Sequence, residues 1–190
     1  MRAPTGHQEP IILTTERLRL RPWRPEDLPR FAALNADPRV MEHFPKLLTS
    51  EESDRQAAGI AEHFRRHAFG FWAVEVIGVA DFVGFVGLSI PTFEAHFTPC
   101  VEIGWRLAFD HWKHGYATEA ARAAVDCGFR RLGLAEIVAF TVPANRRSMA
   151  VMQRLGMTRS PADDFDHPRL PPGHPLRRHV LYRLQRPSEA

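Results

Sequence analysis

The first part of the chain has the apolar and polar spacing of one strand followed by two helices. In "ERLRLRPW", residues 16–23, leucines alternate with arginines, which is the period of a half-exposed strand. The "PED" at 25–27 places proline and acids where a helix begins, so we expect a helix that runs to about residue 35. A second helix is predicted over residues 49–70, where a threonine and a glutamate stand at capping-box spacing before apolar residues at helical intervals.

Three strand-like runs follow in the middle of the chain. They are "FWAVEVI" at 71–77, "DFVGFVGLSI" at 81–90 and "CVEIGWRL" at 100–107. Gly78 lies in the short turn between the first two runs, and such a turn is typical of a hairpin. The sheet is therefore predicted to be antiparallel in this region.

The last part of the chain alternates helices and strands. An alanine-rich helix follows Gly115, "EIVAFTV" at 136–142 has the pattern of a buried strand, and "NRRSMAVMQRLGM" at 145–157 predicts a helix that ends at a glycine. This order favours a parallel crossover. Residues 160–176 are rich in proline and aspartate and are expected to form a loop, and "HVLYRL" at 179–184 is a last strand.

Length and composition predict one cytoplasmic domain. The 190 residues, 44% of them hydrophobic, suffice for one core, so we assign residues 1–190 to a single domain in which 1–10 are flexible. Two cysteines, Cys100 and Cys127, are too few for a disulfide framework and fit a reducing compartment. The sequence shows no pattern of a secretion signal or a membrane span.

Charge and histidine spacing give little support to nucleic acid or metal as partners. The net charge is +3 and the arginines are spread along the chain, whereas a nucleic-acid face needs a basic cluster. His63 and His67 stand four apart on the second helix, but no acidic or cysteine ligand pattern accompanies them, so a solvated helix face is expected. Neither residue is assigned to a metal.

Gly115 is the first feature that indicates chemistry. A helix N-terminus offers unpaired N–H groups and the positive end of a dipole, and a turn with little side-chain bulk lets an anion such as phosphate approach them. The segment lacks both the phosphate-loop and the dinucleotide-binding glycine patterns, so ATP and NAD are disfavoured. The alternative is that Gly115 merely ends an extended segment before a core helix.

The segment around Gly115 resembles a known enzyme family. Residues 101–157 look like the acetyl-coenzyme A core of the Gcn5-related N-acetyltransferase (GNAT) superfamily, and within it the RimJ/RimL-type branch, which acetylates N-terminal amines of ribosomal proteins. "LTTERLRLRPWRPEDL" at 13–28 matches the same branch, and the resemblance spans roughly residues 11–185. It implies a mixed α/β fold with a mostly antiparallel sheet, splayed open between the strands at 100–107 and 136–142, and helices on both faces. A homodimer is also implied.

The resemblance further implies a site for acetyl-coenzyme A as acetyl donor, without a metal. In the family an R/Q-x-x-G-x-G/A loop binds the pyrophosphate through backbone N–H groups. Here the loop starts with Trp112 in place of Arg or Gln, and Lys113 replaces a frequent glycine; backbone binding tolerates both changes. The residues assigned to the coenzyme are Leu107, Lys113, His114, Gly115, Tyr116, Ala117, Thr118 and Asn145.

Two residues are candidates for proton transfer. An acceptor amine with a pKa near ~10 is mostly protonated at neutral pH and must lose a proton before it attacks. Glu102, on the strand that lines the acetyl group in the family, is our candidate base, with Glu75 and Glu94 in reserve; the alternative is an exposed glutamate without a role. Ser148 is the candidate donor to the departing thiolate, and the alternative is that it only belongs to the helix cap formed by Asn145.

The sequence therefore predicts an N-acetyltransferase that moves acetyl directly to a primary amine through a tetrahedral intermediate. The amine belongs to a protein N-terminus or to a small molecule. A non-catalytic acyl-coenzyme A sensor would keep the phosphate-binding loop without the acceptor chemistry. A basic nucleic-acid binder is a third, weaker alternative.

Overall fold

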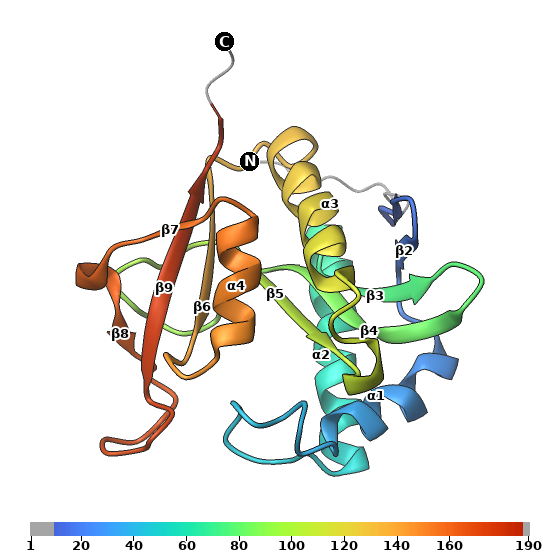
Figure 1. Cartoon of the computed structure of the whole chain (residues 1–190), viewed down its shortest axis with the longest axis horizontal. Coiled ribbons are helices and arrows are strands. Elements are labelled where there is room, and N and C mark those ends of the chain that lie inside the picture. The colour runs from blue at the N-terminus through green and yellow to red at the C-terminus, as the bar shows by residue number, and fades with distance from the viewer. Residues whose placement is uncertain (1–9, 188–190) are drawn as a thin grey trace.

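This computed structural model describes residues 10–187. They fold into a nine-stranded sheet with helices on both faces (Figure 1). The helices are α1 (Leu28–Asn35), α2 (Ser50–His67), α3 (Tyr116–Arg130) and α4 (Arg146–Arg154). The strands are β1 (Leu13–Thr14), β2 (Leu18–Arg21), β3 (Phe71–Val76), β4 (Ala80–Ser89), β5 (Glu102–Leu107), β6 (Glu136–Thr141), β7 (Thr158–Arg159), β8 (Phe165–Asp166) and β9 (Arg178–Gln185).

The strands follow the order β1-β2-β3-β4-β5-β6-β9-β7, and β8 pairs with β9. Every neighbouring pair is antiparallel except β5 and β6. The predicted fold class, a mixed and mostly antiparallel sheet with helices on both faces, is confirmed. The predicted hairpin at Gly78 is also present, as the connection between β3 and β4.

The parallel pair β5 and β6 separates almost as soon as it forms. Glu102 and Val138 are its one pair in register, and the Val138 N–H donates to the Val101 carbonyl over 2.9 Å. Beyond that point the strands diverge, and the indole Nε1 of Trp112 donates to the Leu107 carbonyl over 2.8 Å. The predicted splay between these two strands is confirmed.

The two faces of the sheet have different cores. On one face α3 presents Ala120, Ala121 and Ala124, all fully buried, and these small side chains let the helix lie close to the strands. On the other face, α1 and α2 cover an aromatic cluster that contains Phe31 and Phe85. The predicted capping box of α2 is present, since Thr49 and Glu52 bond reciprocally.

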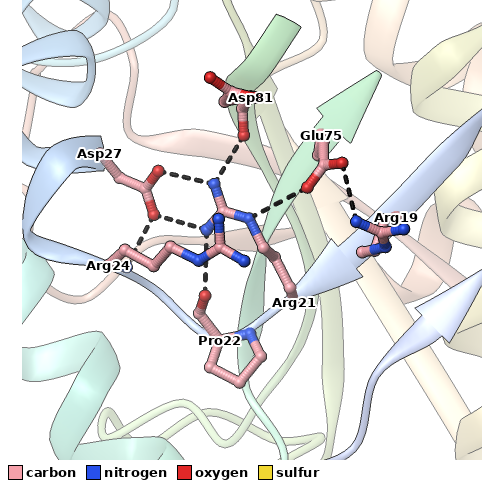
Figure 2. Close-up of polar contacts among 7 residues, drawn as sticks. All are labelled: Arg19, Arg21, Pro22, Arg24, Asp27, Glu75 and Asp81. Atoms are coloured by element: carbon pink, nitrogen blue, oxygen red, sulfur yellow. Dashed lines mark hydrogen bonds and ion pairs between the residues drawn. The ribbon is translucent and has the colours of Figure 1, made fainter. Parts of the chain in front are cut away.

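A buried ion-pair network fastens the first strands together (Figure 2). Arg21 of β2 donates from its two terminal nitrogens to the two carboxylate oxygens of Asp27, each over 2.8 Å. The same guanidinium donates to the Asp81 carbonyl and lies 3.4 Å from Glu75, which also pairs with Arg19. The network therefore connects β2, the turn before α1, β3 and β4 (Figure 2).

The structure differs from two local predictions, the loop at 160–176 and the solvated face at His63. The expected loop at 160–176 contains strand β8, because buried Phe165 packs on the sheet and pairs with His179. His63 does not lie on a solvated face: it is half-buried, its Nδ1 lies 2.8 Å from the Phe69 carbonyl, and its Nε2 accepts from the Ile90 N–H.

The flexible segment expected at 1–10 lies almost wholly outside the described residues. Within the described part of the chain, no helix is long and apolar enough to cross a membrane.

Candidate functional site

A cleft of about 1460 Å³ occupies the gap between β5 and β6. It runs from the first turn of α3 to the segment before β9, and α4 and the connection between α1 and α2 contribute further walls. Glu102, Leu107, Asn145 and Ser148 all line it, although they come from two separate parts of the chain. The split in the sheet thus brings the predicted site residues of β5 and α4 together.

The first turn of α3 opens on this cleft without a side-chain cap. Gly115 is the N-cap residue with φ of +81°, and Lys113 also has a positive φ, of +65°. The first helical hydrogen bond runs from the Glu119 N–H to the Gly115 carbonyl, at 3.0 Å. The three preceding N–H groups, at residues 116–118, have no acceptor within residues 10–187, so they are free to bind an anion.

Residues of the predicted phosphate loop differ in their position. Lys113, Gly115, Tyr116, Ala117 and Thr118 line the cleft. His114 does not: it is exposed, and its ring stacks on the Tyr116 ring with centroids 5.4 Å apart.

Thr15 and Arg17, in the turn between β1 and β2, hold the loop through contacts that the sequence analysis did not predict. Arg17 pairs with Glu119 at 2.5 Å and donates to the His114 carbonyl, and the Thr15 hydroxyl donates to Glu119 over 2.6 Å. These contacts join residues about a hundred positions apart, so no local pattern predicts them.

Asn145 caps α4 with both ends of its amide. Its Oδ1 accepts from the Ser148 N–H and its Nδ2 donates to the Thr141 hydroxyl, each over 3.1 Å. The capping part of the prediction is confirmed, and these two bonds fix Ser148 on the wall of the cleft.

Glu102 lies at the closed end of the cleft, where β5 and β6 still pair. Burial raises the pKa of its carboxyl to about 7, and the positive charge of Arg169 opposes the rise. A carboxyl with this pKa exchanges protons near neutral pH, as a general base must. The reserve candidate Glu75 is committed to Arg19 and Arg21, and neither Glu75 nor Glu94 lines the cleft.

Comparison with known proteins identifies the family. The family model described as an acetyltransferase (GNAT) domain matches residues 17–158. The chain belongs to the GNAT acetyltransferase family. The predicted family and enzyme class are therefore confirmed, and a non-catalytic sensor is not favoured.

Relatives and solved structures agree with the family assignment. FsC-acetyl coenzyme A-N(2)-transacetylase of Aspergillus fumigatus is 32% identical over 194 residues, covering 93% of this chain and 80% of that protein. A GNAT-family acetyltransferase from Bacillus anthracis has a TM-score of 0.76 at 25% identity, covering 93% of this chain and 99% of that one. Mycobacterium smegmatis RimJ, in complex with CoA-disulfide, shares the fold with a TM-score of 0.73 at 20% identity, over 93% and 88% of the two chains.

Three residues to which the sequence analysis gave no role also line the acetyltransferase cleft. His167, Arg169 and His179 line it from the segment between β8 and β9 and the start of β9. The two imidazole rings lie 5.0 Å apart, and burial, together with the charges of His179 and Arg169, lowers the pKa of His167 to about 4. The His167 ring is therefore neutral near pH 7, and burial also lowers the pKa of His179.

Arg106 is the other residue of the acetyltransferase cleft that sequence reasoning missed. It lies on β5 with 8% of its surface exposed, and burial lowers the pKa of its guanidinium to about 10. Its Nη1 donates to Asn35 over 2.5 Å and to Gln56 over 3.2 Å, and the Phe44 ring lies 4.1 Å from its Cζ. A charged residue between Trp105 and Leu107, near the end of a mostly apolar strand, was the signal that could have singled it out.

Proposed function

We propose that this acetyltransferase takes its acetyl group from acetyl-coenzyme A and transfers it directly to a primary amine of a protein N-terminus or a small molecule. The observation that carries the proposal is the split between β5 and β6, which leads to the uncapped first turn of α3. The cleft therefore combines an anion-binding end with an extended groove. Coenzyme A requires both features, because a pyrophosphate and a long pantetheine arm belong to one molecule.

The residues present fit this donor. The free N–H groups at 116–118 would hold the pyrophosphate, and Lys113, Arg122 and Arg147 add positive charge along the same part of the cleft. Peptide groups of a strand point alternately to its two neighbours, so those of Trp105 face the gap toward β6, where β5 has no strand partner. They would bind the amides of the pantetheine arm beside Leu107 and Asn145.

The residues at the closed end would move the protons. The acceptor amine loses a proton to the Glu102 carboxylate, directly or through water, and its nitrogen forms a bond to the acetyl carbon. As the carbon–sulfur bond breaks, the electron pair stays on sulfur and the nitrogen loses its second proton to water. The Ser148 hydroxyl donates a hydrogen bond to the thiolate or passes it a proton, which the serine regains from water. Backbone N–H groups of β5 would stabilise the oxyanion formed between these two events.

The phosphate-binding role is tested with Gly115→Val. The ideal Cβ of residue 115 meets only Arg17, at 3.5 Å, so the protein has room for it, but φ of +81° disfavours valine and its branches would crowd an anion at the turn. Gly133→Val is the matched control, because Gly133 also has a positive φ, of +67°, and does not line the cleft.

Calorimetric titration with acetyl-coenzyme A, thermal melts and thiol release over a panel of amines give the readouts. We expect Gly115→Val to bind acetyl-coenzyme A at least about tenfold more weakly than Gly133→Val does. The two variants should lose similar amounts of thermal stability. Normal affinity in Gly115→Val would contradict the phosphate-binding assignment. Donor binding without thiol release on any amine would contradict the transfer.

A further inference from the structure

Arg106 is a buried cation for which the described residues supply no carboxylate. Its Nη1 bonds to two neutral side-chain oxygens, those of Asn35 and Gln56, and the rings of Phe44 and Phe85 lie 4.1 and 5.4 Å from its Cζ. Its Nε is buried without a hydrogen-bond partner, and Nη2 has no acceptor in residues 10–187. Nη2 therefore keeps N–H groups that a carboxylate could bind, and Nε lies on the same edge of the guanidinium.

The cation is costly to keep in this form. Removing a charge from water without a partner is strongly unfavourable, and the lowered pKa of Arg106 reflects that cost. A cation–π contact and two neutral acceptors offset only part of it. A bound anion would supply the missing charge, and the residue stands on the wall of the substrate cleft.

The position of Arg106 on β5 shows which part of a ligand could reach it. Residues 102, 104 and 106 share one face of the strand, because side chains alternate. This is the face toward α1 and α2, since Arg106 bonds to Asn35 and Gln56 and a Cβ on Gly104 would meet Phe71. Ile103 and Leu107 belong to the core on the opposite, α3 face. Gly104 therefore places no side chain of its own between Glu102 and Arg106, and the Phe71 ring lies beside it in the cleft wall.

We propose that Arg106 binds a carboxylate of the acceptor, so that the substrate is an amine bearing a carboxylate several bonds away. The inference rests on the proposed function, in which the amine lies near Glu102. The Cα atoms of residues 102 and 106 are about 13 Å apart at the usual rise of a strand. An α-amino acid, in which one carbon separates the amine from the carboxylate, is too short for such a span, so an acceptor with three to five intervening carbons fits it better.

The test compares acceptors of graded length with matched neutral analogues. Glycine, β-alanine, 4-aminobutyrate and 6-aminohexanoate would each be compared with the corresponding carboxamide in thiol release, and their binding to the enzyme saturated with coenzyme A would be measured by calorimetry. We expect kcat/KM to favour the carboxylate over the amide by at least about tenfold for the longer acceptors, with little preference for glycine. Equal kcat/KM for acid and amide at every length would overturn the inference.

Variants assign the preference to one side chain. Arg106→Gln should lower kcat/KM for the carboxylates roughly 10- to 100-fold, mainly through KM, and should lower kcat/KM for the amides much less. Arg19→Gln is the matched control, because Arg19 is an exposed strand arginine outside the cleft. Arg106→Lys keeps a point charge without the fork and should give an intermediate loss, so it replaces Arg106→Gln if that variant does not fold. Equal losses on acids and amides would reject Arg106 as the carboxylate site.

The two readouts separate this inference from the proposed function. If the enzyme acetylates carboxylates and carboxamides with equal kcat/KM, acetyl transfer is supported and the carboxylate site is refuted. Selective calorimetric binding of the carboxylates, lost in Arg106→Gln, without any thiol release supports the site and refutes the transfer.

Discussion

Two buried arginines on strands of the same sheet are compensated in opposite ways. Arg21 is 2% exposed and forms a two-bond pair with Asp27, whose carboxylate raises the pKa of the guanidinium (Figure 2). Arg106 is 8% exposed and has only neutral acceptors, so burial alone lowers its pKa to about 10. Their burial is similar, and the charge around them is not.

The difference follows the position of each residue relative to the cleft. Arg21 lies outside the cleft, where it joins β2 to the turn before α1 and to β4. Arg106 and Glu102 both line the cleft, and Glu102 is likewise shifted by burial toward its neutral form. The charge of Arg21 is thus neutralised within the fold, whereas Arg106 and Glu102 form no ion pair within residues 10–187 and face the cleft.

The largest effect is expected at the compensated arginine. Arg21→Gln leaves the Asp27 carboxylate buried without its cation, and removing one partner of such a pair costs about 3–5 kcal/mol in the free energy of unfolding. KM values of the folded fraction should not change, because neither residue lines the cleft. Denaturant unfolding and steady-state kinetics measure the two effects. A loss below about 1 kcal/mol would mean that the network does not stabilise the fold as the comparison requires.

The second effect concerns the uncompensated carboxyl. Glu102→Gln should lower turnover by about 10²-fold while donor binding stays intact. In the wild type, kcat/KM should rise with pH and bend near the Glu102 pKa of about 7, because the base acts in its ionised form. The bend should be absent in Glu102→Gln. A variant with wild-type turnover at every pH would show that Glu102 is not the base.

The same group should also affect stability, with a defined sign. The folded-state pKa of Glu102, about 7, lies above its ordinary value of 4.5, so the folded chain holds the proton more tightly. The free energy of unfolding should therefore fall as pH rises from 4.5 to about 7. Urea titrations of wild type and Glu102→Gln across this window measure the contribution, which the variant should lack.

Local sequence patterns predict the framework of the site well. The strand that carries Glu102, the helix that starts after Gly115 and the cap at Asn145 each depend on residues close together in the chain, so periodicity and capping residues are sufficient. The splay follows from the resemblance to the family rather than from any single segment. Strand β8 was missed because two residues pair with β9 within a proline-rich segment.

Long-range contacts explain what the sequence does not reveal. Arg106 is defined by Asn35 and Gln56, which lie 71 and 50 residues away, and nothing local marks either amide as its partner. His167 and His179 come together because β8 pairs with β9, and their low pKa values depend on that burial. A charge inside an apolar strand shows that something unusual occurs there, but only the fold shows whether a carboxylate compensates it.

A smaller effect is expected when the uncompensated arginine is removed from the ligand-free protein. Arg106→Gln loses the hydrogen bonds to Asn35 and Gln56 but also removes an unpaired buried charge, and these contributions have opposite signs. We expect the free energy of unfolding to change by less than about 1 kcal/mol. Parallel denaturant titrations of this variant and Arg21→Gln test the contrast directly. Equal and large losses would remove the distinction between the two arginines.

The smallest effect is expected at Ser148, a polar but uncharged group on the same cleft wall. Ser148→Ala keeps the backbone N–H that Asn145 caps, so the thermal midpoint should not change, whereas Asn145→Ala should lose about 1 kcal/mol as a cap deletion. A thiolate with a pKa near ~8.5 is a good leaving group and gains little from protonation, so single-turnover thiol release should slow only about 3- to 10-fold. An unchanged rate of thiol release in Ser148→Ala would show that Ser148 has only a structural role in α4. A loss above about 100-fold with intact donor binding would show that departure of the thiolate limits the reaction.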